Sequence, residues 1–118
     1  MVMAVGAENP ILTNAYAIRI YNACMNTWDE AKRWRNLSDH GIDLAGLEGF
    51  FNGDLLTRED TRLAYGEQRL QSIGVFNGVA LFVVWTPRGE HGDTPHLISA
   101  RKAASHEEKA WYQRYRKH

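Results

Sequence analysis

Residues 68–86 read QRLQSIGVFNGVALFVVWT, and they hold the clearest structural signal in the chain. Asn77-Gly78 between two apolar runs is the strongest short-range sign of a β-hairpin, because both residues tolerate the positive φ of a tight turn. The second run, residues 79–85, does not alternate apolar with polar side chains, which is typical of a strand covered on both faces. The stretch therefore predicts a hairpin whose second strand is central in a sheet.

The chain after this hairpin predicts one more strand and a helix. A polar, glycine-containing loop spans residues 87–95, and residues 96–101 resemble a returning strand. Ser105 and Glu108 have the spacing of a capping box, so a C-terminal helix should follow. Trp111 and Tyr115 are four residues apart and share one helix face, which favours their burial, whereas the pattern leaves Tyr112 open.

The chain before the hairpin predicts two helices. Thr27 and Glu30 form a possible capping box for a helix over about residues 28–40, and Gly41 offers the left-handed position that ends it. Asp43 can cap a second helix whose apolar residues recur at three- and four-residue spacing up to residue 51. The sequence therefore predicts an α+β fold with two N-terminal helices, a three- to four-stranded antiparallel sheet and a C-terminal helix.

Composition indicates one compact domain of a cytoplasmic protein. The 118 residues are 44% hydrophobic, enough for one core, and Cys24 is the only cysteine, so no internal disulfide forms. No stretch resembles a signal peptide or a membrane span. We divide the chain into an N-terminal extension, residues 1–24, and a domain of residues 25–118. The periodicity of the extension does not distinguish strand from helix. Met25 is a candidate translation start.

Charge gives a weak indication of a nucleic-acid partner. The chain has 14 basic and 14 acidic residues, yet from residue 101 to 118 six Lys or Arg stand against two Glu. Such a basic end attracts phosphate, although a solvated helix has the same composition. The chain shows no nucleotide-binding, hydrolase or zinc motif, and His91, Asp93 and His96 fit a polar loop better than a metal site. We therefore expect no metal and no cofactor.

Two further groups of polar residues are candidates for chemistry. Lys32, Asn36 and His40 can share one stripe of the first helix, where a histidine could exchange protons, although an ordinary solvent face has the same spacing. Glu67 and Arg69 alternate at the start of a strand, so they can pair with each other or address a phosphate together.

Several of these residues, taken in order, resemble a known family. Trp28-Asp29-Glu30-Ala31-Lys32, then Asn36 and His40-Gly41-Ile42, are similar to the opening motifs of BrnT toxins. The likeness continues over about residues 25–115. Its later landmarks are Gly66-Glu67-x-Arg69, Gly74, Val83-Val84-Trp85-Thr86, Ile98-Ser99-Ala100-Arg101-Lys102-Ala103 and Glu108-x-x-x-Tyr112.

The resemblance implies a RelE-like ribonuclease that halts translation and is neutralised by a ribbon-helix-helix antitoxin of the BrnA type, with operator DNA met only through the antitoxin. Metal-free cleavage needs a proton acceptor and cations that stabilise the pentavalent phosphorane. The resemblance assigns proton transfer to His40 or Glu67, and phosphate binding to Lys32, Arg69 and Arg101. It also implies that three more residues contact the RNA: Lys102, Tyr112 and Asn36.

Two other functions are compatible with the sequence. The first is a non-catalytic, toxin-like module that binds an antitoxin or nucleic acid; growth-neutral expression with tight antitoxin binding would favour it. The second is a housekeeping RNA-binding protein, for which salt-dependent RNA binding without cleavage would be evidence.

Overall fold

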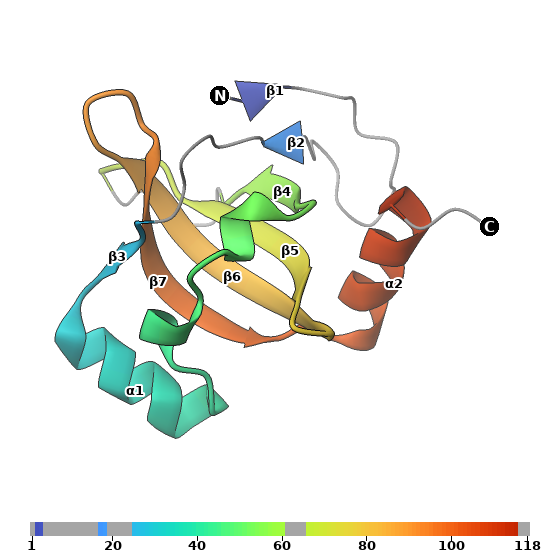
Figure 1. The fold of residues 1–118 in the computed structure, drawn as a ribbon, viewed down its shortest axis with the longest axis horizontal. Coiled ribbons are helices and arrows are strands. Elements are labelled where there is room, and N and C mark those ends of the chain that lie inside the picture. Colours follow the sequence, from blue (N-terminus) through green and yellow to red (C-terminus); the bar gives the residue numbers. More distant parts are fainter. Residues whose placement is uncertain (1, 4–16, 19–24, 61–65, 116–118) are drawn as a thin grey trace.

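A five-stranded mixed sheet forms the centre of the molecule (Figure 1). The computed structural model describes residues 2–3, 17–18, 25–60 and 66–115. The sheet order is β3-β7-β6-β5-β4. Its strands are β3 (Thr27–Trp28), β4 (Leu56–Glu59), β5 (Leu70–Phe76), β6 (Val79–Arg88) and β7 (Thr94–Lys102). A separate antiparallel pair joins β1 (Val2–Met3) to β2 (Ala17–Ile18), while most of the predicted extension, residues 1–24, lies outside the described residues.

The predicted hairpin is confirmed. Asn77 and Gly78 have φ values of 51° and 80°, the left-handed backbone that a two-residue turn between antiparallel strands requires. This turn fixes the register, so that Phe76 pairs with Val79 and Leu70 with Trp85. β6 occupies the middle position of the five strands, as its unbroken apolar sequence predicts.

The prediction of a purely antiparallel sheet is wrong, because β3 pairs with β7 in parallel. Thr27 lies opposite His96 and Trp28 opposite Leu97. A strand of two residues has too few positions to show a period, and its partner lies 69 residues further along the chain, so local sequence carries no signal for it. Thr27 therefore belongs to a strand and does not cap the first helix.

The first helix, α1 (Glu30–His40), is confirmed with a corrected start. The Asp29 side chain accepts a hydrogen bond from the Lys32 N–H and is the N-cap. Gly41, at φ 73°, ends the helix as predicted. α1 lies beside β7, at the opposite end of the molecule from α2 (Ser105–Tyr115) (Figure 1).

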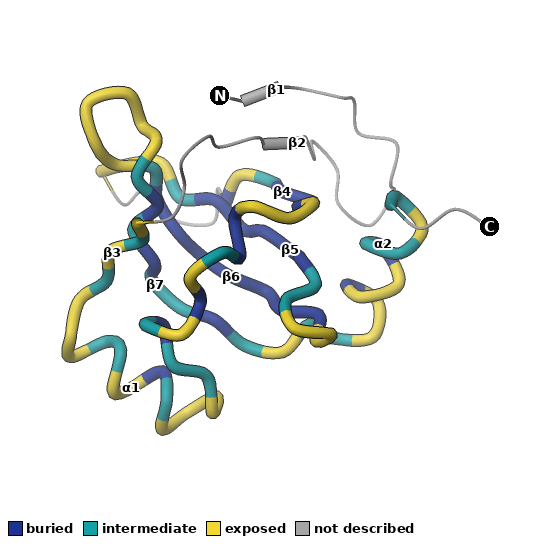
Figure 2. Tube along the Cα trace, viewed as in Figure 1, coloured by how far each residue is buried: buried dark blue, intermediate teal, exposed yellow. Residues whose placement is uncertain are grey.

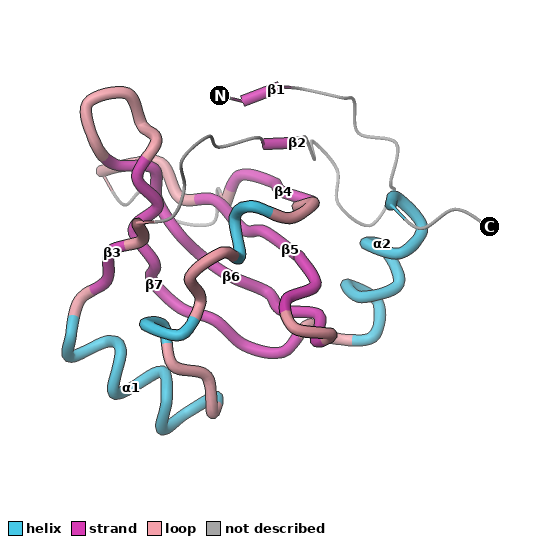
Figure 3. The backbone as a smooth tube through the Cα atoms, in the orientation of Figure 1, coloured by secondary structure: helices cyan, strands magenta, loops and turns pink. Residues whose placement is uncertain are grey.

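The predicted second helix is wrong: the segment forms two short 3-10 turns, η1 (Leu44–Gly46) and η2 (Phe50–Asn52), separated by loop (Figure 3). Asp43 caps η1 as expected, since its carboxylate accepts the Ala45 N–H. Gly49 is left-handed at φ 91°, which interrupts any continuous helix. The apolar spacing correctly identified the buried side of this segment, because that side packs on the sheet in either conformation.

The core lies on both faces of the central strands (Figure 2). On one face Leu81, Val83 and Trp85 of β6 pack under η1 and η2. On the other face Phe82 and Val84 pack under α2. Burial of both faces explains why β6 lacks alternation.

Gly74 marks a close approach within the first face. A Cβ atom there would lie 2.7 Å from the Leu55 side chain and 3.0 Å from Phe50. Glycine at this position therefore lets the segment that contains η2 pack directly on β5.

The Asn36 side chain of α1 forms hydrogen bonds with the edge of β7, beyond the residues that pair with β3. Its Nδ2 donates to the backbone oxygens of Ile42 and Ala100, at 2.8 and 2.9 Å, and its Oδ1 accepts the Ala100 N–H at 3.0 Å. The side chain is 4% exposed. Asn36 thus bonds the strand edge as a neighbouring strand would.

Substituting Asn36 with alanine should lower the free energy of unfolding by about 1–3 kcal/mol, because buried backbone groups of β7 and Ile42 lose their partners. Urea unfolding measures the change, with the exposed Asn52→Ala as the matched control. Equal stability of the two variants would show that the edge is satisfied by other means.

Candidate active site

Two adjoining depressions form a groove between α1 and the sheet, which we call the α1–β7 groove. The larger has a volume of about 390 Å³ and the smaller about 170 Å³. Lys32 and Ile98 line both, so the two lie next to each other. The larger is also lined by Trp28, Asp29, Glu67, Arg69, Arg88 and His96, and the smaller by Arg35, Asn36, Asp39, His40 and Ser99.

Strand register brings the groove residues of the sheet together. His96 pairs with Thr86, two residues before Arg88 on β6, so His96 and Arg88 share a face with Val84. α2 covers the part of this face around Val84 and Phe82. The polar residues lie further along the same face, beside the N-terminal end of α1.

Glu67 and Arg88 form an ion pair at one side of the larger depression. The Arg88 guanidinium donates to Glu67 at 2.9 Å, and both side chains are more than 40% exposed. The hydrogen bond from Arg88 is the main cause that lowers the pKa of Glu67. Glu67 is therefore ionised near neutral pH, and it orients Arg88.

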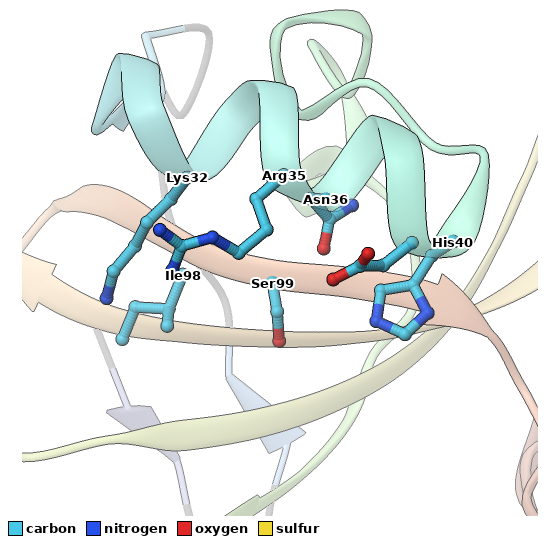
Figure 4. Close-up of a pocket in the computed structure, with 7 residues that line it drawn as sticks. Lys32, Arg35, Asn36, His40, Ile98 and Ser99 are labelled. Carbon is cyan, nitrogen blue, oxygen red and sulfur yellow. The ribbon is translucent and has the colours of Figure 1, made fainter.

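Lys32 extends from α1 across β7 together with Arg35 (Figure 4). Within the described part of the chain, the Lys32 ammonium makes no ion pair, while its backbone N–H bonds the Asp29 cap. Lys32 is thus a cation available to an anionic ligand. His40 lies at the C-terminal end of α1, in the smaller depression, and is exposed.

Of the predicted site residues, the groove brings together Lys32, Asn36, His40, Glu67 and Arg69. Arg101, Lys102 and Tyr112 lie outside it. Tyr112 stacks edge-on against Trp111 in α2, with ring centroids 5.0 Å apart. Trp111 and Tyr115 pack against the core beneath α2, as their spacing predicts.

Arg101 binds Glu107 rather than lining the groove. Its guanidinium donates to both Glu107 oxygens, at 2.8 and 2.9 Å, and stacks 4.1 Å above the Phe82 ring. Glu107 also accepts the Ala104 N–H at the start of α2. Burial alone would raise the pKa of Glu107, but the hydrogen bonds from Arg101 and Ala104 outweigh it and hold this pKa below its usual value.

The Arg101→Ala variant should lose about 1.5–3 kcal/mol of stability at pH 7, since Glu107 loses charge-assisted bonds. Because the pKa of Glu107 is lower in the folded state, the interactions of its carboxylate stabilise the fold above the unfolded pKa of 4.5. This stabilisation is lost as the pH falls through the folded pKa, so the difference in stability between the variant and wild type should shrink at pH 3. Urea titrations at both pH values test this, with Lys102→Ala as the neighbouring control. Unchanged stability with reduced RNA cleavage would instead assign Arg101 to the substrate.

Sequence reasoning missed three groove residues, Arg35, Arg88 and His96. Arg88 and His96 lie on either side of a polar loop, and the composition of this loop gives no sign of a site. Strand pairing places both residues in the same depression as Lys32. The Thr27 hydroxyl oxygen is 2.7 Å from Nδ1 of His96. Burial is the main cause that lowers the pKa of His96, and the nearby Arg88 lowers it further.

The described residues include no group of three or more His, Cys, Asp or Glu side chains arranged to hold a metal ion. None of the helices in this part of the chain has the length and apolar character needed to cross a membrane.

Comparison with known proteins identifies a family. No curated protein matches the chain. The model of one family, described as the ribonuclease toxin BrnT of type II toxin-antitoxin systems, matches residues 28–107, a range that contains every residue of the α1–β7 groove. The chain therefore belongs to the BrnT family of ribonuclease toxins of type II toxin-antitoxin systems.

Proposed function

We propose that this toxin cleaves RNA in the α1–β7 groove without a metal ion, stops translation by doing so, and is neutralised by a ribbon-helix-helix antitoxin. The domain of residues 25–118, with a RelE-like arrangement of sheet and helices, would carry this activity. One observation carries the proposal: three cationic side chains, Lys32, Arg69 and Arg88, line the same depression as the titratable side chains Glu67 and His96.

The arrangement suits an internal attack on phosphorus. Cleavage by the 2′-hydroxyl requires its deprotonation, stabilisation of added negative charge on the phosphate oxygens, and protonation of the leaving oxygen. Three cationic side chains around one depression can supply the charge stabilisation. Arg35 extends the basic surface along α1, where the neighbouring phosphate of a strand of RNA would lie.

The test uses the purified full-length chain and a labelled single-stranded RNA. We expect cleavage in EDTA at the same rate as in Mg²⁺, with products ending in a 2′,3′-cyclic phosphate. Loss of cleavage in EDTA, restored by added metal, would refute the metal-free mechanism. RNA binding without cleavage would favour the non-catalytic module.

The partner is tested separately in cells. Induction of the toxin should arrest growth with loss of RNA integrity and of amino-acid incorporation. Co-expression of the cognate antitoxin should reverse all three effects, and the antitoxin should co-purify with the toxin as a complex. An antitoxin of another fold in that complex would overturn the ribbon-helix-helix assignment and leave the nuclease assignment intact.

A further inference from the structure

His96 combines three properties that set it apart in the groove. It lies on β7 in the larger depression, together with Lys32 and Arg88. Its side chain is partly buried, and one ring nitrogen, Nδ1, is held 2.7 Å from the Thr27 hydroxyl oxygen. A histidine with one ring nitrogen engaged and the other available is arranged as a proton-transfer group.

The parallel pairing of β3 with β7 creates the Thr27 contact. The register places Thr27 opposite His96, and neighbouring strands bring their side chains side by side on the same face. When the Nδ1–H of neutral His96 donates to the Thr27 oxygen, Nε2 has no hydrogen and carries a lone pair. Thr27 therefore holds the ring in place, and in this tautomer Nε2 is the nitrogen that can accept a proton.

We infer that His96 is the general base of RNA cleavage and that Thr27 is the positioning residue that orients its ring. The inference rests on the ribonuclease function proposed above. It adds a proton acceptor in the groove beside the two residues, His40 and Glu67, to which the family resemblance assigns that role.

The charges around His96 favour the neutral ring that a base requires. Burial lowers its pKa most, and Arg88 and Lys32 lower it further. Glu67 and Asp29 act in the opposite direction, and the balance is a pKa below 6.5. Among the residues that the structure describes, Arg69 is the remaining charged group that lines the same depression. His96 is thus neutral near pH 7.

The proposed step is balanced within the groove and solvent. His96 Nε2 takes the proton of the 2′-hydroxyl as the 2′-oxygen forms its bond to phosphorus. The bond from phosphorus to the 5′-oxygen breaks, leaving a 2′,3′-cyclic phosphate, and the departing 5′-oxygen takes a proton from water. The imidazolium then releases its proton to solvent, which restores the neutral base.

Glu67 is less suited to this step. Its pKa is lowered by the hydrogen bond from Arg88, which makes the carboxylate a weaker proton acceptor. Protonating it would also break that pair. Glu67 serves better by orienting Arg88 toward the phosphate.

The experiment compares His96→Ala with His91→Ala, a control in the exposed loop before β7. We expect His96→Ala to lower the cleavage rate by about a hundredfold or more, mainly in kcat, and to lose the acidic limb of the pH-rate profile. Added imidazole should restore part of this rate. Circular dichroism and thermal melting verify folding, and His96→Asn, whose amide can still bond Thr27, is used if the alanine variant is unfolded.

Thr27 is tested with a pair of variants. Thr27→Val removes the hydroxyl at nearly constant volume and should lower kcat roughly tenfold with a shifted acidic limb, as expected for a group that orients another. Thr27→Ser keeps the hydroxyl and should stay near wild type. A purely structural role of Thr27 would change melting temperature without moving the pH profile.

The outcomes distinguish a wrong assignment of the general base from a wrong assignment of the ribonuclease function. If the wild-type protein cleaves RNA and the folded His96 variants cleave within about threefold of it with an unchanged pH profile, the base is another residue and the ribonuclease function stands. If the wild-type protein does not cleave RNA, the proposed function fails, and the inference fails with it.

Discussion

Lys32→Ala is expected to lower the rate of RNA cleavage on the order of a hundredfold, while the melting temperature stays close to that of wild type. Lys32 lines both depressions of the groove, and its ammonium forms no ion pair within the described residues. Removing it therefore breaks no pair of the fold but removes a positive charge beside the reacting phosphate. Single-turnover cleavage of a short labelled RNA measures the effect.

The control for Lys32 is Lys109→Ala. Lys109 is also a helical lysine, exposed on α2 outside the groove, so its loss should change cleavage less than twofold. Lys32→Arg keeps the charge with a different shape and should recover part of the rate. A Lys32→Ala protein as active as the Lys109 control would place the reacting phosphate elsewhere.

Trp85→Ala should destabilise the protein by about 3–5 kcal/mol, a large part of the stability of a domain this size. Trp85 is 1% exposed in the centre of β6. Its ring meets Phe51 edge-on at 4.8 Å between centroids, and its Nε1 donates to the Ser72 hydroxyl at 2.8 Å. Alanine would leave a cavity between the sheet and the η2 segment.

Trp34→Ala is the matched comparison, because Trp34 is 56% exposed on α1 and contacts Arg33 across its ring. Its loss should cost less than about 1 kcal/mol. Urea unfolding at pH 7 gives both values. Similar losses in the two variants would mean that the β6 core repacks around the cavity.

The fold could be predicted wherever a local pattern determines the structure. Asn77-Gly78 identifies the hairpin from two residues, and Gly41 marks the end of α1. The same reasoning failed where the chain has little local pattern. The apolar spacing of residues 44–51 is compatible both with a helix and with two 3-10 turns. The left-handed backbone of Gly49 favours the turns, but it is visible only in the structure.

The candidate site could be predicted only in part, because its residues come from distant segments. Lys32 and Glu67 were identified through motifs, whereas His96 looked like part of a polar loop. The contact of His96 with Thr27 depends on the parallel pairing of β3 with β7. A parallel strand of two residues leaves no trace in composition or in hydrophobic period. Arg101 also belongs to a family motif, yet its guanidinium binds Glu107. The sequence pattern did not predict this pair.

The pairing of β3 with β7 also has a consequence for synthesis of the protein. Thr27 leaves the ribosome early, but its partner His96 is made 69 residues later, and a parallel pair cannot form before both strands have emerged. A nascent chain therefore carries Lys32 without His96 until most of the domain has been translated. The larger depression of the groove is therefore completed only after β7 has been synthesised.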